Sequence, residues 1–187
     1  MRFNRHSDLE GRHAFLSASK SSWSNYDDDK FARTYMTALA AREGTELHEL
    51  AARLIHHKVR LPRNDKTLNQ YVNDAIGFRM IPEQVLAYSN NAFGTADAIH
   101  YSKNFLRIHD LKTGENEVTS FRQLEIYVAF FCLEYDIKPI ELDVELRIYQ
   151  NDQVKIHVPD LDDIINIVDK IVRFDRMIED MKAEALL

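Results

Sequence analysis

Apolar and polar residues alternate most regularly between positions 141 and 150. Every second residue from Leu142 to Ile148 is apolar, and a period of two predicts a strand with one buried face. Asn151-Asp152 follows this segment and predicts a tight hairpin turn into a second strand at 154–158. Extended patterns over 84–89, 95–101 and 105–112 predict three further strands.

The other long segments have helical periodicity. Apolar residues recur at helical spacing over 30–59 and 67–80, and the stretch 119–135 is largely apolar. We expect Thr119 or Ser120 to cap the helix over 119–135. A final amphipathic helix begins at Leu161. We expect its long apolar stripe to pack on the rest of the chain, and an oligomer contact is the alternative.

This order of elements predicts an α/β fold in which a mixed central sheet is flanked by helices. The chain has 187 residues, of which 45% are hydrophobic, and this suits one compact domain. We expect a single domain over 1–187. Its parts would be a helical N-terminal region at about 16–80, a sheet with its motif helix at about 82–136, and a C-terminal hairpin and helix at 140–187.

The densest candidate chemistry lies at Asp110 and Lys112, two residues apart in the predicted strand 105–112. Residues i and i+2 share a face of a strand, so this carboxylate and ammonium lie side by side, while Leu111 points to the opposite, apolar side. Asp97 precedes them at a separation that suits an adjacent antiparallel strand, reached through a turn near 102–104. The two aspartates would then meet across the ladder.

The carboxylates of Asp97 and Asp110 and the backbone carbonyl of Leu111 are oxygen ligands of the kind that Mg²⁺ binds. Lys112 beside such an ion would orient or deprotonate an attacking water, or stabilise charge on a phosphorane-like transition state. Asp-x-Lys is a short motif, and its ordinary interpretation is a solvated ion pair at an exposed strand edge.

Two predicted helices carry further candidates. Gln123 and Tyr127 stand four residues apart and share a helix face, where a metal site or a phosphate would provide polar partners. An ordinary position at the helix surface is the alternative. His48 lies at the edge of the apolar stripe of 30–59, and its imidazole is a good ligand for Mn²⁺ and a tolerable one for Mg²⁺. A lone histidine also occurs in purely structural roles.

Four motifs in this order resemble those of RecB-like nucleases in the PD-(D/E)XK superfamily. They are Gly44-Thr45-x-x-His48, Gly94-x-x-Asp97, Asp110-x-Lys112-Thr113-Gly114 and Gln123-x-x-x-Tyr127. The resemblance covers roughly 16–135, and a weaker Ser17-Ala18-Ser19 stretch also resembles the opening of such domains. The Asp-Leu-Lys-Thr-Gly core at 110–114 is its most specific part.

The resemblance implies a role for each matching residue. The metal ligands would be His48, Asp97, Asp110 and the Leu111 carbonyl, and the catalytic lysine would be Lys112. Gln123 and Tyr127 would support the lysine or the scissile phosphate, and Mg²⁺ or Mn²⁺ would be the cofactor. Glu46 and Glu49 flank His48, and the sequence leaves open which of these side chains reaches the metal.

Two features of such relatives are missing from this sequence. Many of them hold an iron–sulfur cluster with four cysteines, whereas this chain has only Cys132, so we expect no iron–sulfur cluster. Relatives within large helicase-nucleases also carry ATPase motors, but no Gly-x-x-x-x-Gly-Lys-Ser/Thr occurs here. A motor or recombination protein would therefore be a separate polypeptide.

The formal net charge of −6 counts against generic nucleic-acid binding. Basic residues gather in two clusters that would flank a DNA path or would simply be solvated: Arg2, Arg5, Arg12 and His13, then His56, His57, Lys58, Arg60 and Arg63. Trp23, Tyr26 and Tyr35 would stack on unpaired bases or would be plain core aromatics.

Composition also limits the compartment. A single cysteine argues against a disulfide scaffold and suits a reducing cytoplasm. The sequence has no apolar run long enough for a membrane span and a polar N-terminus unlike a signal peptide. We expect a cytoplasmic protein, located in the host cytoplasm if it is encoded by a phage.

The sequence therefore predicts a Mg²⁺- or Mn²⁺-dependent deoxyribonuclease, and the resemblance favours an exonuclease over an endonuclease. DNA ends in recombination, repair or phage DNA metabolism are the expected substrate, with a homo-oligomer or a separate motor as possible assemblies. The alternative is a DNA-end-binding adaptor with a nuclease fold and weak or no catalysis. RNA as substrate stays open.

Overall fold

The computed structural model describes residues 14–185 and divides the chain into two compact units, Met1–Glu43 and Gly44–Leu187. The boundary falls inside helix α1 (Asp28–His56). The basic cluster at positions 2–13 lies outside the described residues. The single-domain expectation stays a prediction, and each unit is described by itself below.

The first unit consists of a 3₁₀ helix, η1 (Ala18–Asn25), and the beginning of α1. The indole N–H of Trp23 donates a hydrogen bond of 2.9 Å to the Ser17 carbonyl. The rings of Phe15, Phe31 and Tyr35 pack against one another. Aromatic residues of this unit thus contact each other, and base stacking by them stays a prediction.

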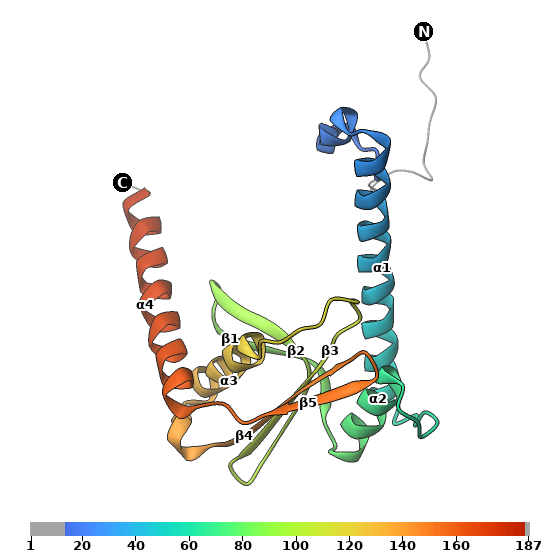
Figure 1. Ribbon diagram of the computed structural model, residues 1–187. Coiled ribbons are helices and arrows are strands. Elements are labelled where there is room, and N and C mark those ends of the chain that lie inside the picture. Colours follow the sequence, from blue (N-terminus) through green and yellow to red (C-terminus); the bar gives the residue numbers. More distant parts are fainter. Residues whose placement is uncertain (1–13, 186–187) are drawn as a thin grey trace. The chain divides into compact units, whose positions relative to one another are not determined.

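The second unit contains the sheet (Figure 1). After the end of α1, its elements are α2 (Thr67–Gly77), β1 (Ile81–Ser89), β2 (Ala92–Ser102), β3 (Phe105–Leu111), α3 (Arg122–Tyr135), the short 3₁₀ helix η2 (Pro139–Glu141), β4 (Asp143–Gln150), β5 (Gln153–His157) and α4 (Leu161–Ala185). The five strands lie in the order β1-β2-β3-β4-β5. Only β3 and β4 are parallel, and α3 forms the crossover between them. The predicted α/β class with a mixed sheet is confirmed.

Both predicted hairpin turns are present. Asn151 and Asp152 have φ of 52° and 59°, and Lys103 and Asn104 have φ of 51° and 62°. Positive φ at both central residues defines the turn whose twist matches that of the flanking strands, and Asn and Asp tolerate this backbone well. These turns fix the β4–β5 register and the β2–β3 register, and the latter brings Asp97 and Asp110 onto neighbouring strands.

The sheet separates two cores. On one side, called the α3 face, the strands pack against α3 and α4; the buried residues include Leu106, Ile108, Leu124, Val128, Leu146, Ile148 and Ile164. On the other side, called the α2 face, the strands pack against α2 and the end of α1; the buried residues include Ala51, Ile55, Tyr71, Val72, Leu111 and Tyr149. Cys132 is buried on the α3 face, and burial raises the pKa of its thiol to about 11.

The start of α3 differs from the prediction. The helix begins at Arg122, and neither Thr119 nor Ser120 occupies the cap position, which belongs to Phe121. The Ser120 hydroxyl still accepts a hydrogen bond of 3.2 Å from the Arg122 N–H. The segment before the helix is held in another conformation because Val118 is tied to β4 and β5: its N–H donates to Gln150 at 2.8 Å, and its carbonyl accepts from Lys155 at 2.9 Å.

Helix α4 is only partly covered by its own unit. Ile164 and Ile167 are buried, and α4 lies beside α3 (Figure 1). Further along the helix, Phe174, Met177 and Met181 are about half exposed. Packing on its own chain is therefore seen for the first turns, and an oligomer contact through the rest stays a prediction. No helix within residues 14–185 combines the length and the apolar character needed to cross a membrane.

Candidate metal centre

Asp110 near the end of β3 and Lys112, just after the strand, are neighbours. The Lys112 ammonium donates a hydrogen bond of 3.1 Å to Asp110 Oδ1 and lies 2.9 Å from Oδ2. Asp110 Oδ2 is buried and accepts no hydrogen bond of good geometry, although it lies at ion-pair distance from the Lys112 ammonium. Leu111, between the two, is buried on the α2 face. The side chains thus have the orientation that the two-residue spacing predicts.

Strand β2 brings Asp97 next to this pair. Asp97 Oδ2 accepts a hydrogen bond of 2.9 Å from the Leu111 N–H and lies 3.3 Å from His48 Nδ1. In an extended strand the N–H and C=O of one residue point to the same side. We therefore expect the Leu111 carbonyl, one of the predicted ligands, to be directed toward β2 and Asp97 as well.

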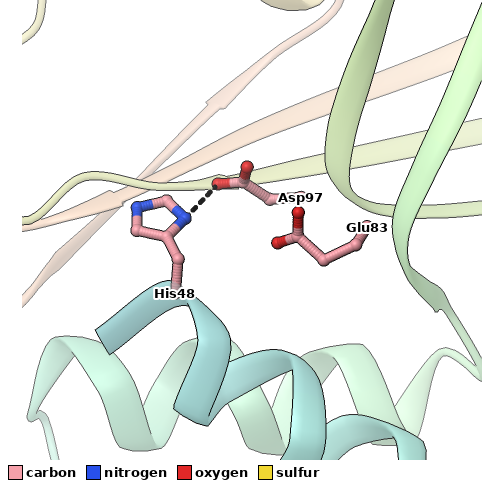
Figure 2. A group of neighbouring side chains, drawn as sticks. All are labelled: His48, Glu83 and Asp97. Carbon is pink, nitrogen blue, oxygen red and sulfur yellow. Dashed lines mark ion pairs between the residues drawn. The ribbon is translucent and has the colours of Figure 1, made fainter. Parts of the chain in front are cut away.

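Glu83 completes a group that the sequence did not reveal. One ligand atom from each of His48, Glu83 and Asp97 lies within 4.8 Å of the other two (Figure 2). His48 comes from α1, Glu83 from β1 and Asp97 from β2. Glu46 and Glu49, the acidic alternatives beside His48, are not members of this group, whereas Glu83 is.

The sheet is irregular where Glu83 and Asp97 lie. Ala96 and Ile99 both pack on the α3 face although they are three residues apart, and Ala98 packs on the α2 face. Strict alternation would put 96 and 99 on opposite sides, so β2 departs from it at 97–98. On β1 the flanking pairs of the ladder place Glu83 opposite Asp97, and Glu83 has a φ of 50°. A left-handed residue within a strand re-aims its side chain and is costly unless the surroundings hold it.

Helix α3 places a polar chain beside the lysine. The Lys112 ammonium donates a hydrogen bond of 2.8 Å to Gln123 Oε1, and Gln123 Nε2 donates one of 3.2 Å to the Tyr127 hydroxyl. The four-residue spacing on α3 therefore puts the amide and the phenol on one side of the helix, as predicted. Asp110, Lys112, Gln123 and Tyr127 form a continuous chain of contacts.

Two motif glycines allow these elements to approach closely. A Cβ on Gly44 of α1 would lie 2.6 Å from Thr113 Oγ1, and a Cβ on Gly94 of β2 would lie 2.9 Å from a ring carbon of Tyr127. Both separations are shorter than a side-chain contact allows. Glycine at these positions thus lets α1 reach the segment after Lys112 and lets the Tyr127 ring pack on β2.

The candidate metal ligands carry more negative than positive charge. Burial, followed by the Asp97 charge, raises the pKa of Asp110 to about 6, and the nearby Lys112 offsets only part of this. Burial and the Asp97 charge also raise the pKa of Glu83. The pKa of His48 is raised above 6.5, first by its hydrogen bond to Asp97 and then by the charges of Asp97, Asp110 and Glu83. A cation among these groups would favour their ionised carboxylates and a neutral imidazole.

A second polar network lies across the sheet, on the α2 face. His109 is fully buried, and its Nδ1 lies 3.2 Å from the Tyr149 hydroxyl, which donates a hydrogen bond of 2.8 Å to Asp74. Arg147 contacts Asp74 at 3.3 Å. Burial, Arg147 and Arg107 lower the pKa of His109 to about 2, so this imidazole is neutral at physiological pH. The sequence prediction did not include this network.

Comparison with known proteins finds no matching family model, no matching curated protein and no matching solved structure. The site geometry and the sequence motifs are therefore the basis for the function proposed below.

Proposed function

We propose that this chain is a metal-dependent deoxyribonuclease with a PD-(D/E)XK core of the RecB-like kind. The observation that carries the proposal is the convergence of His48, Glu83 and Asp97, from α1, β1 and β2. Asp110 of β3 is not a member of this group, but its charge acts on His48 and its carboxylate contacts the ammonium of Lys112. Three carboxylates and one imidazole form an oxygen-rich ligand set that suits Mg²⁺ and, with the imidazole, Mn²⁺.

The ligand set fits a divalent cation on grounds of its own chemistry. The buried Asp110 Oδ2 lacks a directed hydrogen bond, and the pKa values of Asp110 and Glu83 are each raised by burial and by the charge of Asp97. His48, Glu83, Asp97 and Asp110 would hold the ion, together with the Leu111 carbonyl. When bound, such an ion polarises a phosphoryl oxygen and lowers the pKa of water.

Lys112 is the residue proposed to act on the reacting phosphate or on the attacking water. An ammonium has three N–H donors, of which one is directed to Asp110 and one to Gln123. The third is left to orient a water or to stabilise charge that develops on the phosphate oxygens. Gln123 and Tyr127 hold the ammonium in place, since the amide accepts from Lys112 while donating to the phenol.

The same proposal includes DNA ends as the substrate and exonuclease action in recombination, repair or phage DNA metabolism. Both rest on the motif resemblance. The acidic net charge does not oppose the proposal at this site, because the carboxylates there would hold a cation that offsets their charge.

The test is cleavage of linear and closed-circular DNA, single- and double-stranded, with Mg²⁺, Mn²⁺ or EDTA. We expect metal-dependent loss of linear DNA, abolished in Lys112→Ala and in Asp110→Ala. Lys170→Ala and Asp169→Asn, which change the same residue types on the exposed side of α4, are matched controls and should cleave like wild type. Cleavage of closed circles would identify an endonuclease, and RNA degradation in a parallel assay would change the substrate.

Two outcomes would reject the enzymatic proposal. Equal cleavage by wild type, Lys112→Ala and Asp110→Ala would mean that a contaminating nuclease is responsible. Retention of DNA in EDTA without cleavage under any metal would favour the adaptor instead.

A further inference from the structure

A cavity of about 450 Å³ opens beside the metal-ligand group. It is lined by Thr45, His48, Glu49, Ala52, Arg53 and Glu83. All but Glu83 come from α1 and recur at three- and four-residue spacing, so they share one side of that helix. Two candidate metal ligands, His48 and Glu83, thus form part of the wall of a cavity large enough for a nucleotide unit.

Arg53 is the one permanently cationic group in this wall. Its guanidinium is exposed and makes no ion pair or hydrogen bond with any residue in the 14–185 range. Glu49 precedes it by four residues, the spacing at which a helical carboxylate and guanidinium ordinarily pair, yet no ion pair joins these two described residues. The donors of Arg53 are therefore available to a ligand.

The position of Arg53 complements that of Lys112. Lys112 contacts Asp110, whereas Arg53 shares its cavity with His48 and Glu83. Arg53 follows His48 by five residues, which is about 7.5 Å along a helix axis. This offset is comparable to the step from one phosphate to the next along a nucleic-acid strand. A phosphate neighbouring the one at the metal would therefore be within reach of the guanidinium fork, which matches phosphate oxygens in pairs.

We infer that Arg53 is a positioning residue that binds the phosphate of the DNA strand adjacent to the scissile one. The inference rests on the proposed function and adds a subsite to it: the cavity beside α1 holds the backbone of the strand being cut. Arg53 fixes the register of that strand relative to Asp97 and Lys112 without touching the reacting atoms. Glu49, in the same wall, weakens the subsite through charge repulsion.

The experiment measures DNA binding and cleavage together. Binding of a fluorescently labelled oligonucleotide is followed by anisotropy over a series of KCl concentrations, with Ca²⁺ in place of Mg²⁺ to suppress cleavage. Steady-state cleavage is measured with Mg²⁺. The proteins are wild type, Arg53→Gln, Arg53→Lys, Glu49→Gln and, as matched control for a solvent-exposed arginine, Arg176→Gln on α4.

For Arg53→Gln we expect KM to rise about tenfold and kcat to change little. The slope of the logarithm of the DNA-binding constant against the logarithm of salt concentration should become less steep by about 0.7 to 0.9, the value of one lost phosphate contact. Arg53→Lys should recover most of the slope because it keeps the charge, and Glu49→Gln should bind more tightly than wild type. A purely structural role for Arg53 would lower the thermal midpoint and leave the slope unchanged.

Three results would overturn the inference, and they are distinguishable. If wild type binds and cleaves DNA while Arg53→Gln keeps the wild-type slope and KM, the subsite is wrong and the proposed function stands. If wild type neither binds nor cleaves DNA, both fail together. Loss of slope in Arg176→Gln equal to that in Arg53→Gln would also reject the subsite, because the effect would then come from net charge.

Discussion

The two faces of the sheet carry polar networks of opposite character at the same level of β3. On the α2 face, Arg107 and Arg147 pair with Glu145, Arg147 also contacts Asp74, and the neutral His109 is enclosed behind Tyr149. Each acidic group there faces a guanidinium. On the other side of the backbone Asp110 contacts Lys112, and its charge adds to those of the nearby His48, Glu83 and Asp97.

The difference separates a network whose charges are balanced within the protein from one whose charges are not, although each contains one buried polar atom without a hydrogen bond, His109 Nε2 and Asp110 Oδ2. Charge on the α2 face is balanced within the protein, which is the usual state of a structural polar cluster. Across the sheet the carboxylates repel one another, and burial raises the pKa of Asp110 to about 6. Protein folding alone does not favour such an arrangement, and under the proposed function a bound cation would offset the repulsion. Two adjacent residues, His109 and Asp110, thus belong to different polar networks.

The largest expected effect comes from removing one ligand on the unbalanced side. Asp97→Asn keeps the size of the side chain but removes the charge that contacts His48, so we expect cleavage to fall more than about a hundredfold. Tyr149→Phe removes a hydroxyl from the balanced network, and we expect cleavage within about threefold of wild type but a loss of roughly 1 to 3 kcal/mol of stability. Cleavage rates and urea unfolding measure the two effects. Equal loss of activity in both variants would contradict the distinction between the faces.

The next effect is the pH dependence of metal binding. The pKa of His48 is raised above 6.5 and that of Asp110 is raised to about 6, so both groups are protonated as the pH falls from 8 to 6, and protons compete with the cation. Raised pKa values stabilise the metal-free protein at low pH, and this contribution is lost as the pH rises through them.

We therefore expect the apparent Mn²⁺ affinity to weaken by on the order of tenfold per pH unit for each of the two groups, once the pH is below the pKa of that group. The Mn²⁺-induced rise in thermal midpoint should be larger at pH 8 than at pH 6, and calorimetry at both pH values measures it. An affinity independent of pH would mean that His48 and Asp110 are not ligands.

A smaller effect concerns the close approach at Gly94. In Gly94→Ala the new methyl group would meet the Tyr127 ring, so the ring and the Gln123 amide bonded to it must shift away from Lys112. We expect kcat to fall about tenfold with metal affinity unchanged, a loss typical of a displaced positioning group. Gly77→Ala, where a Cβ meets nothing within 4 Å, is the matched control and should retain full activity. Wild-type kcat in Gly94→Ala would remove Tyr127 from the mechanism.

The smallest effect has the opposite sign. Asp110→Asn removes a buried charge whose pKa is raised to about 6 from 3.8, and each unit corresponds to about 1.4 kcal/mol. Since the lost contact with Lys112 offsets part of this, we expect the metal-free variant to be roughly 1 to 3 kcal/mol more stable than wild type at pH 8. Thermal unfolding in EDTA measures the change. A lower midpoint would show that the ion pair with Lys112 outweighs the burial of Asp110.

Periodicity predicted most of the fold, because its strands and helices obey simple spacing rules. The alternation at Leu142–Ile148 and the turns at Lys103-Asn104 and Asn151-Asp152 depend on local backbone preferences, and the structure has them where predicted. The start of α3 was wrong because long-range hydrogen bonds from Gln150 and Lys155 decide the conformation of Val118. Local capping preferences contain no information about such contacts.

The candidate site also has residues that the sequence predicted and one that it did not. The neighbours Asp110 and Lys112, and the pair Gln123 and Tyr127, followed from spacing within single elements. Glu83 was missed because its segment begins with Ile81-Pro82 and was predicted to become a strand only at position 84. Its position depends on a left-handed φ and on pairing with β2, and neither is visible in the local pattern. A search for acidic residues opposite Gly94-x-x-Asp97 would have found it.

The buried thiol of Cys132 has a practical consequence. It is the only cysteine of the chain, and with a pKa of about 11 and a place in the core on the α3 face it stays protonated and shielded from alkylating reagents. A cysteine introduced on the surface would then be the sole target for maleimide dyes. Single-site labelling, and with it single-molecule fluorescence on DNA, requires no prior removal of native thiols.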